Sequence, residues 1–183
     1  MLRRFLFAMT IATPALADVP EAVQNTILPG YDRFVVATQA LSDAAAQDCA
    51  PEALRPAFNA AFDAWVAVQY LQFGPVEDDG KRLAIEYWPD PKGMGAKAQR
   101  RILLGDPSQL EPAAFAEQSV AARGLAALER LLYPAEAPPA DTCPLIRATT
   151  LDLARMAAEV QAAWTGGYAD TLLTAGQPGN TTF

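Results

Sequence analysis

Apolar residues recur along most of the chain at three- and four-residue steps, the spacing that places side chains on one face of an α-helix. This pattern predicts helices over about 23–48, 51–73, 112–133 and 143–173. The expected inward positions are Ile27, Tyr31, Phe34, Thr38 and Leu41; Phe58, Phe62, Trp65, Gln69 and Phe73; Ala121, Leu125, Leu128 and Leu132; and Leu145, Thr149, Leu153, Met156, Val160 and Trp164. Gly74-Pro75 is predicted to end the second helix, and Gly166-Gly167 to bend or interrupt the fourth.

The segment between Pro75 and Pro112 is rich in proline and glycine. Proline lacks a backbone N–H and glycine weakens a helix, so only short helices such as 96–103 are expected there. We therefore predict a long, structured crossover between the second and third helices. No stretch shows the alternating pattern of a strand, so the expected fold class is all-α, as an up-and-down four-helix bundle.

The first 17 residues have the features of a secretory signal peptide. Arg3 and Arg4 precede an apolar run that is too short to span a bilayer, and Ala15-Leu-Ala17 offers a cleavage site. We expect removal of residues 1–17 and one helical domain over 18–183. No later segment is apolar for long enough to cross a membrane, so no membrane span is predicted after removal of the signal.

Cys49 and Cys143 are the two cysteines of the chain. Export would place them in an oxidising compartment, where a pair of cysteines can form one disulfide. The end of the first helix and the start of the fourth meet at one end of an up-and-down bundle, which brings the two residues together. The alternative is two separate buried thiols.

Charge and residue content exclude several classes of function. The formal net charge is −7, which opposes binding to nucleic acids or to anionic membranes because both rely on basic patches. The chain has no histidine, so catalytic sites and zinc sites that require an imidazole are excluded.

The candidate functional groups are therefore carboxylates. Glu129 lies at the edge of the third apolar stripe, beside the small residues Ala122 and Ala126. It is either a boundary residue whose head reaches water, or a half-buried carboxylate with a raised pKa. Glu86 lies in a similar apolar setting and Asp90 lies between two prolines; a solvated loop is the simple interpretation for both. All three are candidate ligand or metal-binding residues.

Four segments of the chain resemble a known family in their order and spacing. They are AWVAVQYLQFGP (64–75), EYWPD (86–90), GLAALE (124–129) followed by LLY, and AWTGGY (163–168). Together they resemble the imelysin-like proteins, also called the peptidase M75 or iron-regulated periplasmic protein group, over about residues 25–175. The resemblance implies a periplasmic, all-helical protein that is usually built from two similar bundles and is linked with iron acquisition.

The hallmark of that family is G-x-H-x-x-E, in which histidine and glutamate share one helix face and have been proposed to bind metal. Gly124 and Glu129 match its first and last positions, whereas Ala126 occupies the histidine position. A single carboxylate is a poor site for a transition metal, so iron or another divalent metal is only weakly supported as a cofactor.

The leading hypothesis is a non-catalytic, exported domain that binds a small ligand or a periplasmic protein partner within iron or metal uptake. The alternatives are a metallopeptidase of the M75 type, which the missing histidine opposes, and a structural or adaptor bundle. Because the family usually has two bundles, the chain is either a short member or the first half of a longer protein.

Overall fold

The computed structural model describes residues 18–180, and all regular secondary structure within this range is helical. The helices are α1 Val19–Ala22, α2 Leu28–Gln47, α3 Pro51–Val66, α4 Lys81–Ile85, α5 Met94–Leu103, α6 Pro112–Ala116, α7 Gly124–Leu132, α8 Cys143–Ala163 and α9 Ala169–Leu173. The all-α fold class is confirmed. The predicted signal peptide lies outside the described residues. No helix in the described part of the chain combines the length and the hydropathy that a bilayer crossing requires.

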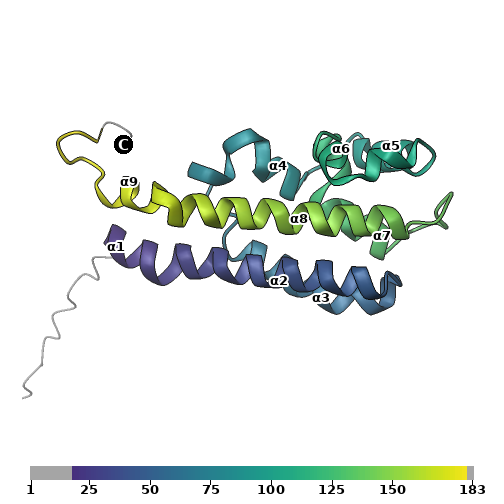
Figure 1. Cartoon of the computed structure of the whole chain (residues 1–183), viewed down its shortest axis with the longest axis horizontal. Coiled ribbons are helices and arrows are strands. Elements are labelled where there is room, and N and C mark those ends of the chain that lie inside the picture. The colour runs from purple at the N-terminus through teal and green to yellow at the C-terminus, as the bar shows by residue number, and fades with distance from the viewer. Residues whose placement is uncertain (1–17, 181–183) are drawn as a thin grey trace, which may run out of the picture.

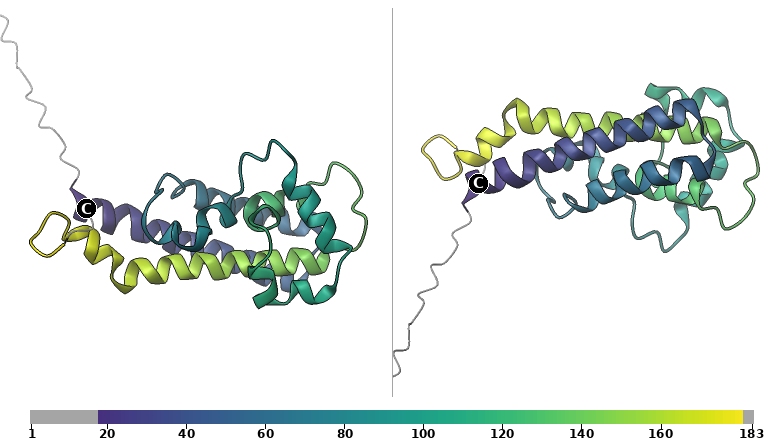
Figure 2. Two further views of the ribbon diagram at one scale, coloured as in Figure 1. Left: turned by 90° about the horizontal axis from the view of Figure 1, so that it is seen from above. Right: turned by 90° about the horizontal axis from the view of Figure 1, so that it is seen from below.

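The long helices α2 and α8 pack along each other, α3 packs on α2, and the shorter α7 packs on both α3 and α8 (Figure 1). These four helices enclose most of the core, in which Phe34, Trp65, Leu125 and Leu153 are almost completely buried. Helices α2, α3, α7 and α8 therefore form a bundle along the part of the molecule that the short helix α7 covers. In Figure 1 the crossover segments α4, α5 and α6 form a further layer on the side of α8 that faces away from α2, and Figure 2 shows the molecule from above and below this stack.

Two of the long helices contain a π-helical turn where the sequence predicts a single helix. The first helix begins at Val19, and the turn Val23–Ile27 (η1) joins α1 to α2. In the fourth, the turn Trp164–Tyr168 (η6) joins α8 to α9, and Gly167 has a φ of 136°. The predicted interruption at Gly166-Gly167 is therefore confirmed.

The second and third helices differ from their predicted extents. Helix α3 ends at Val66 rather than at residue 73, and turns follow that keep Val68 and Leu71 buried. The predicted helix 112–133 is wrong as one element, because it is divided into α6, the 3-10 turn Val120–Ala122 (η5) and α7. Ser119 and Arg123 have extended ψ angles of 130° and 168°, which end one helical segment before the next begins.

The crossover contains more helix than its proline and glycine content suggests. The predicted short helix 96–103 is observed as α5, which begins two residues earlier at Met94. The crossover also contains α4 and three 3-10 turns: Gly74–Val76 (η2), Asp78–Gly80 (η3) and Pro107–Leu110 (η4).

A disulfide joins Cys49 to Cys143, with the two Cα atoms 5.5 Å apart. Cys49 lies between α2 and α3, and Cys143 is the first residue of α8. The predicted pairing at one end of the bundle is confirmed, and the alternative of two separate thiols is excluded.

Candidate functional site

The motif segment 124–129 forms the first two turns of α7, and its glycine is required by a close backbone approach. Gly124 has a φ of 70°, and a Cβ atom there would lie 2.1 Å from the carbonyl oxygen of Ala84 and 2.2 Å from that of Ile85. Both the left-handed backbone and the lack of space favour glycine. Gly124 therefore allows the start of α7 to pack closely against the end of α4.

Ala126 and Glu129 lie on the same helix, but their surroundings differ. Ala126 is 7% exposed, whereas the Glu129 side chain is exposed to solvent. The boundary interpretation of Glu129, in which the head reaches water, agrees with this position. Ala126 has no atom that could bind a metal, so Glu129 is without the partner that the motif would supply one helical turn away.

Glu129 lies in a hollow between α3 and α7, which we call the Glu129 hollow. It has a volume of about 300 Å³ and is lined by Phe58, Asn59, Phe62, Asp63, Glu129 and Tyr133. The rings of Phe58 and Phe62 are 6.0 Å apart between centroids, and those of Phe58 and Tyr133 are 6.2 Å apart. The Tyr133 hydroxyl donates a hydrogen bond of 3.4 Å to Asn59 Oδ1.

The carboxylates of Glu86 and Asp90 accept hydrogen bonds from other parts of the protein, one from a buried side chain and the other from backbone N–H groups. Glu86, at the end of α4, accepts a hydrogen bond of 2.6 Å from the indole N–H of the buried Trp65. Asp90 accepts hydrogen bonds from the backbone N–H groups of Met94 (2.8 Å) and Gly95 (2.7 Å) at the start of α5. These bonds to Gly95 and Met94 lower the pKa of Asp90.

The three predicted carboxylates do not converge on one point. Within residues 18–180, no group of three or more aspartate, glutamate or cysteine side chains is placed so that it could hold a metal ion. Glu129 shares its hollow with Asp63 rather than with Glu86 or Asp90. Two carboxylates without an imidazole or a thiolate are a poor ligand set for iron or zinc.

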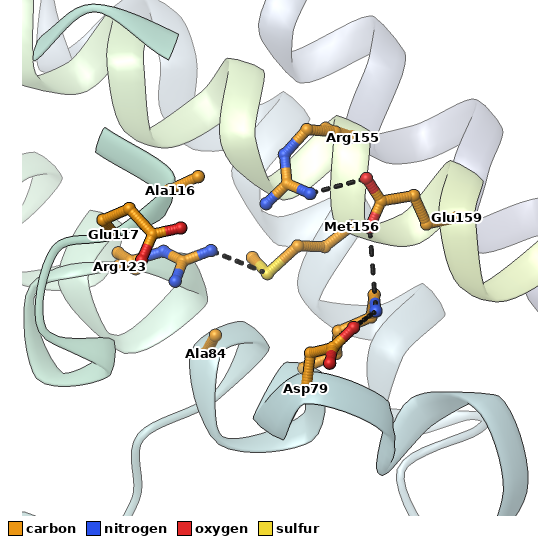
Figure 3. A pocket seen from close by; sticks show the side chains of 9 residues that line it. Asp79, Ala84, Ala116, Glu117, Arg123, Arg155, Met156 and Glu159 are labelled. Atoms are coloured by element: carbon orange, nitrogen blue, oxygen red, sulfur yellow. Dashed lines mark hydrogen bonds and ion pairs between the residues drawn. The ribbon is translucent and has the colours of Figure 1, made fainter. Parts of the chain in front are cut away.

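A second cavity, of about 380 Å³, lies between α8 and the crossover and is rich in charged side chains (Figure 3). Five of its lining residues carry a charge that is paired within the protein. Arg123 binds Asp152 with 2.8 Å between Nε and Oδ2, and Arg155 binds both Asp152 (2.7 Å) and Glu159 (2.6 Å). Lys81 lies 3.2 Å from Asp79 and 3.8 Å from Glu159.

These contacts form one continuous chain of ion pairs from the crossover to α8. The side chains of Arg123 and Asp152 are 9% and 4% exposed, so the pair between them is buried. Three carboxylates and three cations line the cavity, so its lining charges balance, and Asp152 pairs with Arg123 and Arg155 from outside the lining. The ion pairs at the cavity connect η5 and α4 to α8.

The sequence alone predicts neither this charged cavity nor the Glu129 hollow. The i, i+3 and i, i+4 spacing of Asp152, Arg155 and Glu159 on one helix was a readable signal for part of the ion-pair chain. Phe58 and Phe62 are predicted core residues, and no local signal brings them beside Glu129, whereas Tyr133 follows Glu129 by four residues on the same helical stretch.

Three of the four segments that carry the family resemblance are joined by direct contacts, and the segment 124–129 touches the residues just before 86–90. Trp65 binds Glu86, and Gly124 touches the residues just before Glu86. The ring of Trp164 packs against Phe73 at 6.0 Å and against Tyr168 at 5.0 Å. The resemblance thus covers a connected set of structural contacts as well as the motif.

Comparison with known proteins agrees with this pattern. The sequence profile of the peptidase M75 family, described as imelysin, matches residues 27–182. The chain belongs to the imelysin family. No curated protein matches it significantly.

Among solved structures, an imelysin-like protein from Psychrobacter arcticum 273-4 has a similar fold, with a TM-score of 0.71 and 22% sequence identity. The similarity covers 85% of this chain and 51% of the other, so this imelysin chain spans about half the length of that protein. At this identity the comparison supports the fold alone.

Proposed function

We propose that this imelysin-family chain is a non-catalytic domain that acts by binding a ligand at the Glu129 hollow. The observation that carries the proposal is the buried Ala126 at the histidine position of the motif, beside an exposed Glu129. The helix that would present a metal-binding pair is retained, but one of the two ligands is absent. What remains is a concave surface with aromatic walls and two carboxylates, which suits binding.

We also propose that the chain is exported to the periplasm and takes part in the uptake of iron or another metal species. The disulfide supports export, because structural disulfides form in oxidising compartments. The sequence of residues 1–17 supports removal of a signal peptide. The link to iron comes from the family resemblance. In this proposal the domain comprises residues 18–183.

A peptidase assay tests the non-catalytic part of the proposal. Peptide hydrolysis by a metallopeptidase requires a metal-bound water and a general base, and Glu129 alone can supply only the base. We expect the purified chain to cleave no member of a broad peptide library, with or without added Zn²⁺, as followed by mass spectrometry.

The variants Glu129→Gln and Glu117→Gln separate true activity from contamination. Both remove one exposed carboxylate, but only Glu129 belongs to the motif. Cleavage by the parent that disappears in Glu129→Gln and persists in Glu117→Gln would contradict the proposal and favour the metallopeptidase alternative.

A further inference from the structure

We infer that the ligand of the Glu129 hollow is an organic ammonium cation, such as a quaternary or alkyl amine. This inference rests on the proposed function, since it assumes that the chain acts by binding at this place. The inference is drawn from three observations: the negative charge of the hollow, its aromatic walls, and an arginine that already lies over the ring of one lining residue.

The charge of the hollow is negative. Asp63 and Glu129 are two of its six lining residues, and no lysine or arginine lines it. In the described part of the chain, neither carboxylate has an ion pair or accepts a side-chain or backbone hydrogen bond. Glu129 also interacts electrostatically with its neighbour Arg130, which does not line the hollow. The net charge of −7 favours the approach of a cation to the two carboxylates.

The charge of the lining residues distinguishes the hollow from the charged cavity. In the cavity, Asp79 and Glu159 are already paired with Lys81 and Arg155, and Arg123 is a third lining cation. A cationic ligand there would meet three cations of the protein, whereas no lysine or arginine lines the hollow.

The walls of the hollow favour an organic cation over a bare metal ion. Three of the six lining residues are aromatic, and an aromatic ring attracts a cation over its face without donating a lone pair. Quaternary and alkyl ammonium groups gain from such faces, whereas Zn²⁺ and iron require further oxygen, nitrogen or sulfur ligands.

One of the rings already binds a cation within the protein. The guanidinium carbon of Arg55 lies 4.6 Å from the centroid of the Tyr133 ring. Arg55 is held there by two hydrogen bonds, of 3.0 and 2.9 Å, to the carbonyl oxygen of Leu132. Tyr133 lines the hollow and Arg55 does not, so this ring shows that a cation is held against an aromatic wall at the border of the hollow.

The test compares choline with 3,3-dimethyl-1-butanol, which has the same shape but no charge. Each is titrated into the ¹⁵N-labelled parent protein, and shifts of the backbone amide signals of 58–63 and 129–133 are followed by NMR. We expect choline to bind with a Kd of about 1–10 mM, and the neutral analogue to bind at least about tenfold more weakly.

Variants locate the site. We expect Glu129→Gln and Tyr133→Leu to weaken choline binding at least about fivefold, and Glu117→Gln, which makes the same charge change outside the hollow, to leave it unchanged. Circular dichroism confirms that each variant is folded. Asp63→Asn provides a second test if Tyr133→Leu does not fold.

Three results would overturn the inference: equal binding of choline and its neutral analogue, equal weakening by Glu117→Gln and Glu129→Gln, or no shift at about 50 mM choline. None of these results would indicate peptidase activity. The proposed class of ligand can therefore be wrong while the proposed non-catalytic function still holds. If the inference holds, a role in uptake would involve an organic ligand rather than a bare metal ion.

Discussion

Gly124 is a residue whose backbone and surroundings both exclude a side chain. Its φ of 70° is unfavourable for alanine, and a Cβ atom would meet two carbonyl oxygens of α4 within 2.2 Å. The motif glycine is thus explained by packing between α4 and α7.

We predict that Gly124→Ala lowers the free energy of unfolding by about 3 kcal/mol or more, because backbone strain and a steric clash add together. Urea unfolding followed by circular dichroism measures this change.

Gly80→Ala is the matched control for this substitution. Gly80 has a similar φ of 68°, but no atom lies within 4 Å of the position of its Cβ. It should cost only about 1 kcal/mol, the cost of the left-handed backbone for alanine. Equal losses for the two variants would show that the contact with α4 is unimportant.

At the scale of the elements, η5 and α8 are joined by the buried pair of Arg123 and Asp152. Removing one member of a buried ion pair leaves the other charge uncompensated in a poorly solvated place. We predict that Asp152→Ala lowers the free energy of unfolding by about 3–5 kcal/mol in urea.

Glu159→Ala is the control for Asp152→Ala, because it removes a carboxylate of the same ion-pair chain that is 43% exposed. It should cost less than about 1 kcal/mol, as is usual for exposed pairs. A loss for Asp152→Ala no larger than that for Glu159→Ala would contradict a structural role for the buried pair.

The elements also show what local pattern can and cannot predict. Helices α2, α3, α5 and α8 follow from apolar spacing and from proline and glycine positions, which are local properties. The division of the predicted helix 112–133 does not follow from local pattern. The extended conformation of Arg123 accompanies its pairing with Asp152, which is 29 residues away in the sequence. The contact between Gly124 and α4 is likewise a tertiary constraint.

The same limit applies to the candidate site. Glu129 was identified from its motif and its place at the edge of an apolar stripe. The hollow, however, combines Phe58 and Phe62 of α3 with Glu129 and Tyr133 from the end of α7. Their proximity depends on the packing of the two helices, which residue spacing within either helix does not determine.

At the scale of the whole molecule, the disulfide joins residues 94 positions apart. In the chain-entropy model, closing a loop of this length in the unfolded state stabilises the fold by about 3–5 kcal/mol. We predict a loss of this size for the variant Cys49→Ser with Cys143→Ser, measured by urea unfolding.

A reducing agent provides the control for the disulfide. It should destabilise the parent by a similar amount and leave the double variant unchanged, since that variant has no bond to reduce. Identical unfolding curves for the oxidised parent and the double variant would contradict the prediction.

The central claim is that the metal-binding pair of the motif is absent from this imelysin-family chain. Positions 126 and 129 are three residues apart on α7, so Ala126→His would place an imidazole near the Glu129 carboxylate. Two protein ligands bind Zn²⁺ only weakly, but more tightly than one. Because Ala126 is buried, we also expect the larger side chain to cost about 1–3 kcal/mol of stability.

Titration calorimetry with Zn²⁺ on three folded proteins tests this claim most directly: the parent, Ala126→His, and Ala126→His combined with Glu129→Ala. We predict that Ala126→His binds Zn²⁺ at least about tenfold more tightly than the parent, and that adding Glu129→Ala removes most of the gain. If the parent already binds Zn²⁺ as tightly as Ala126→His, the chain has a metal site elsewhere, and Glu86 and Asp90 become the next residues to test.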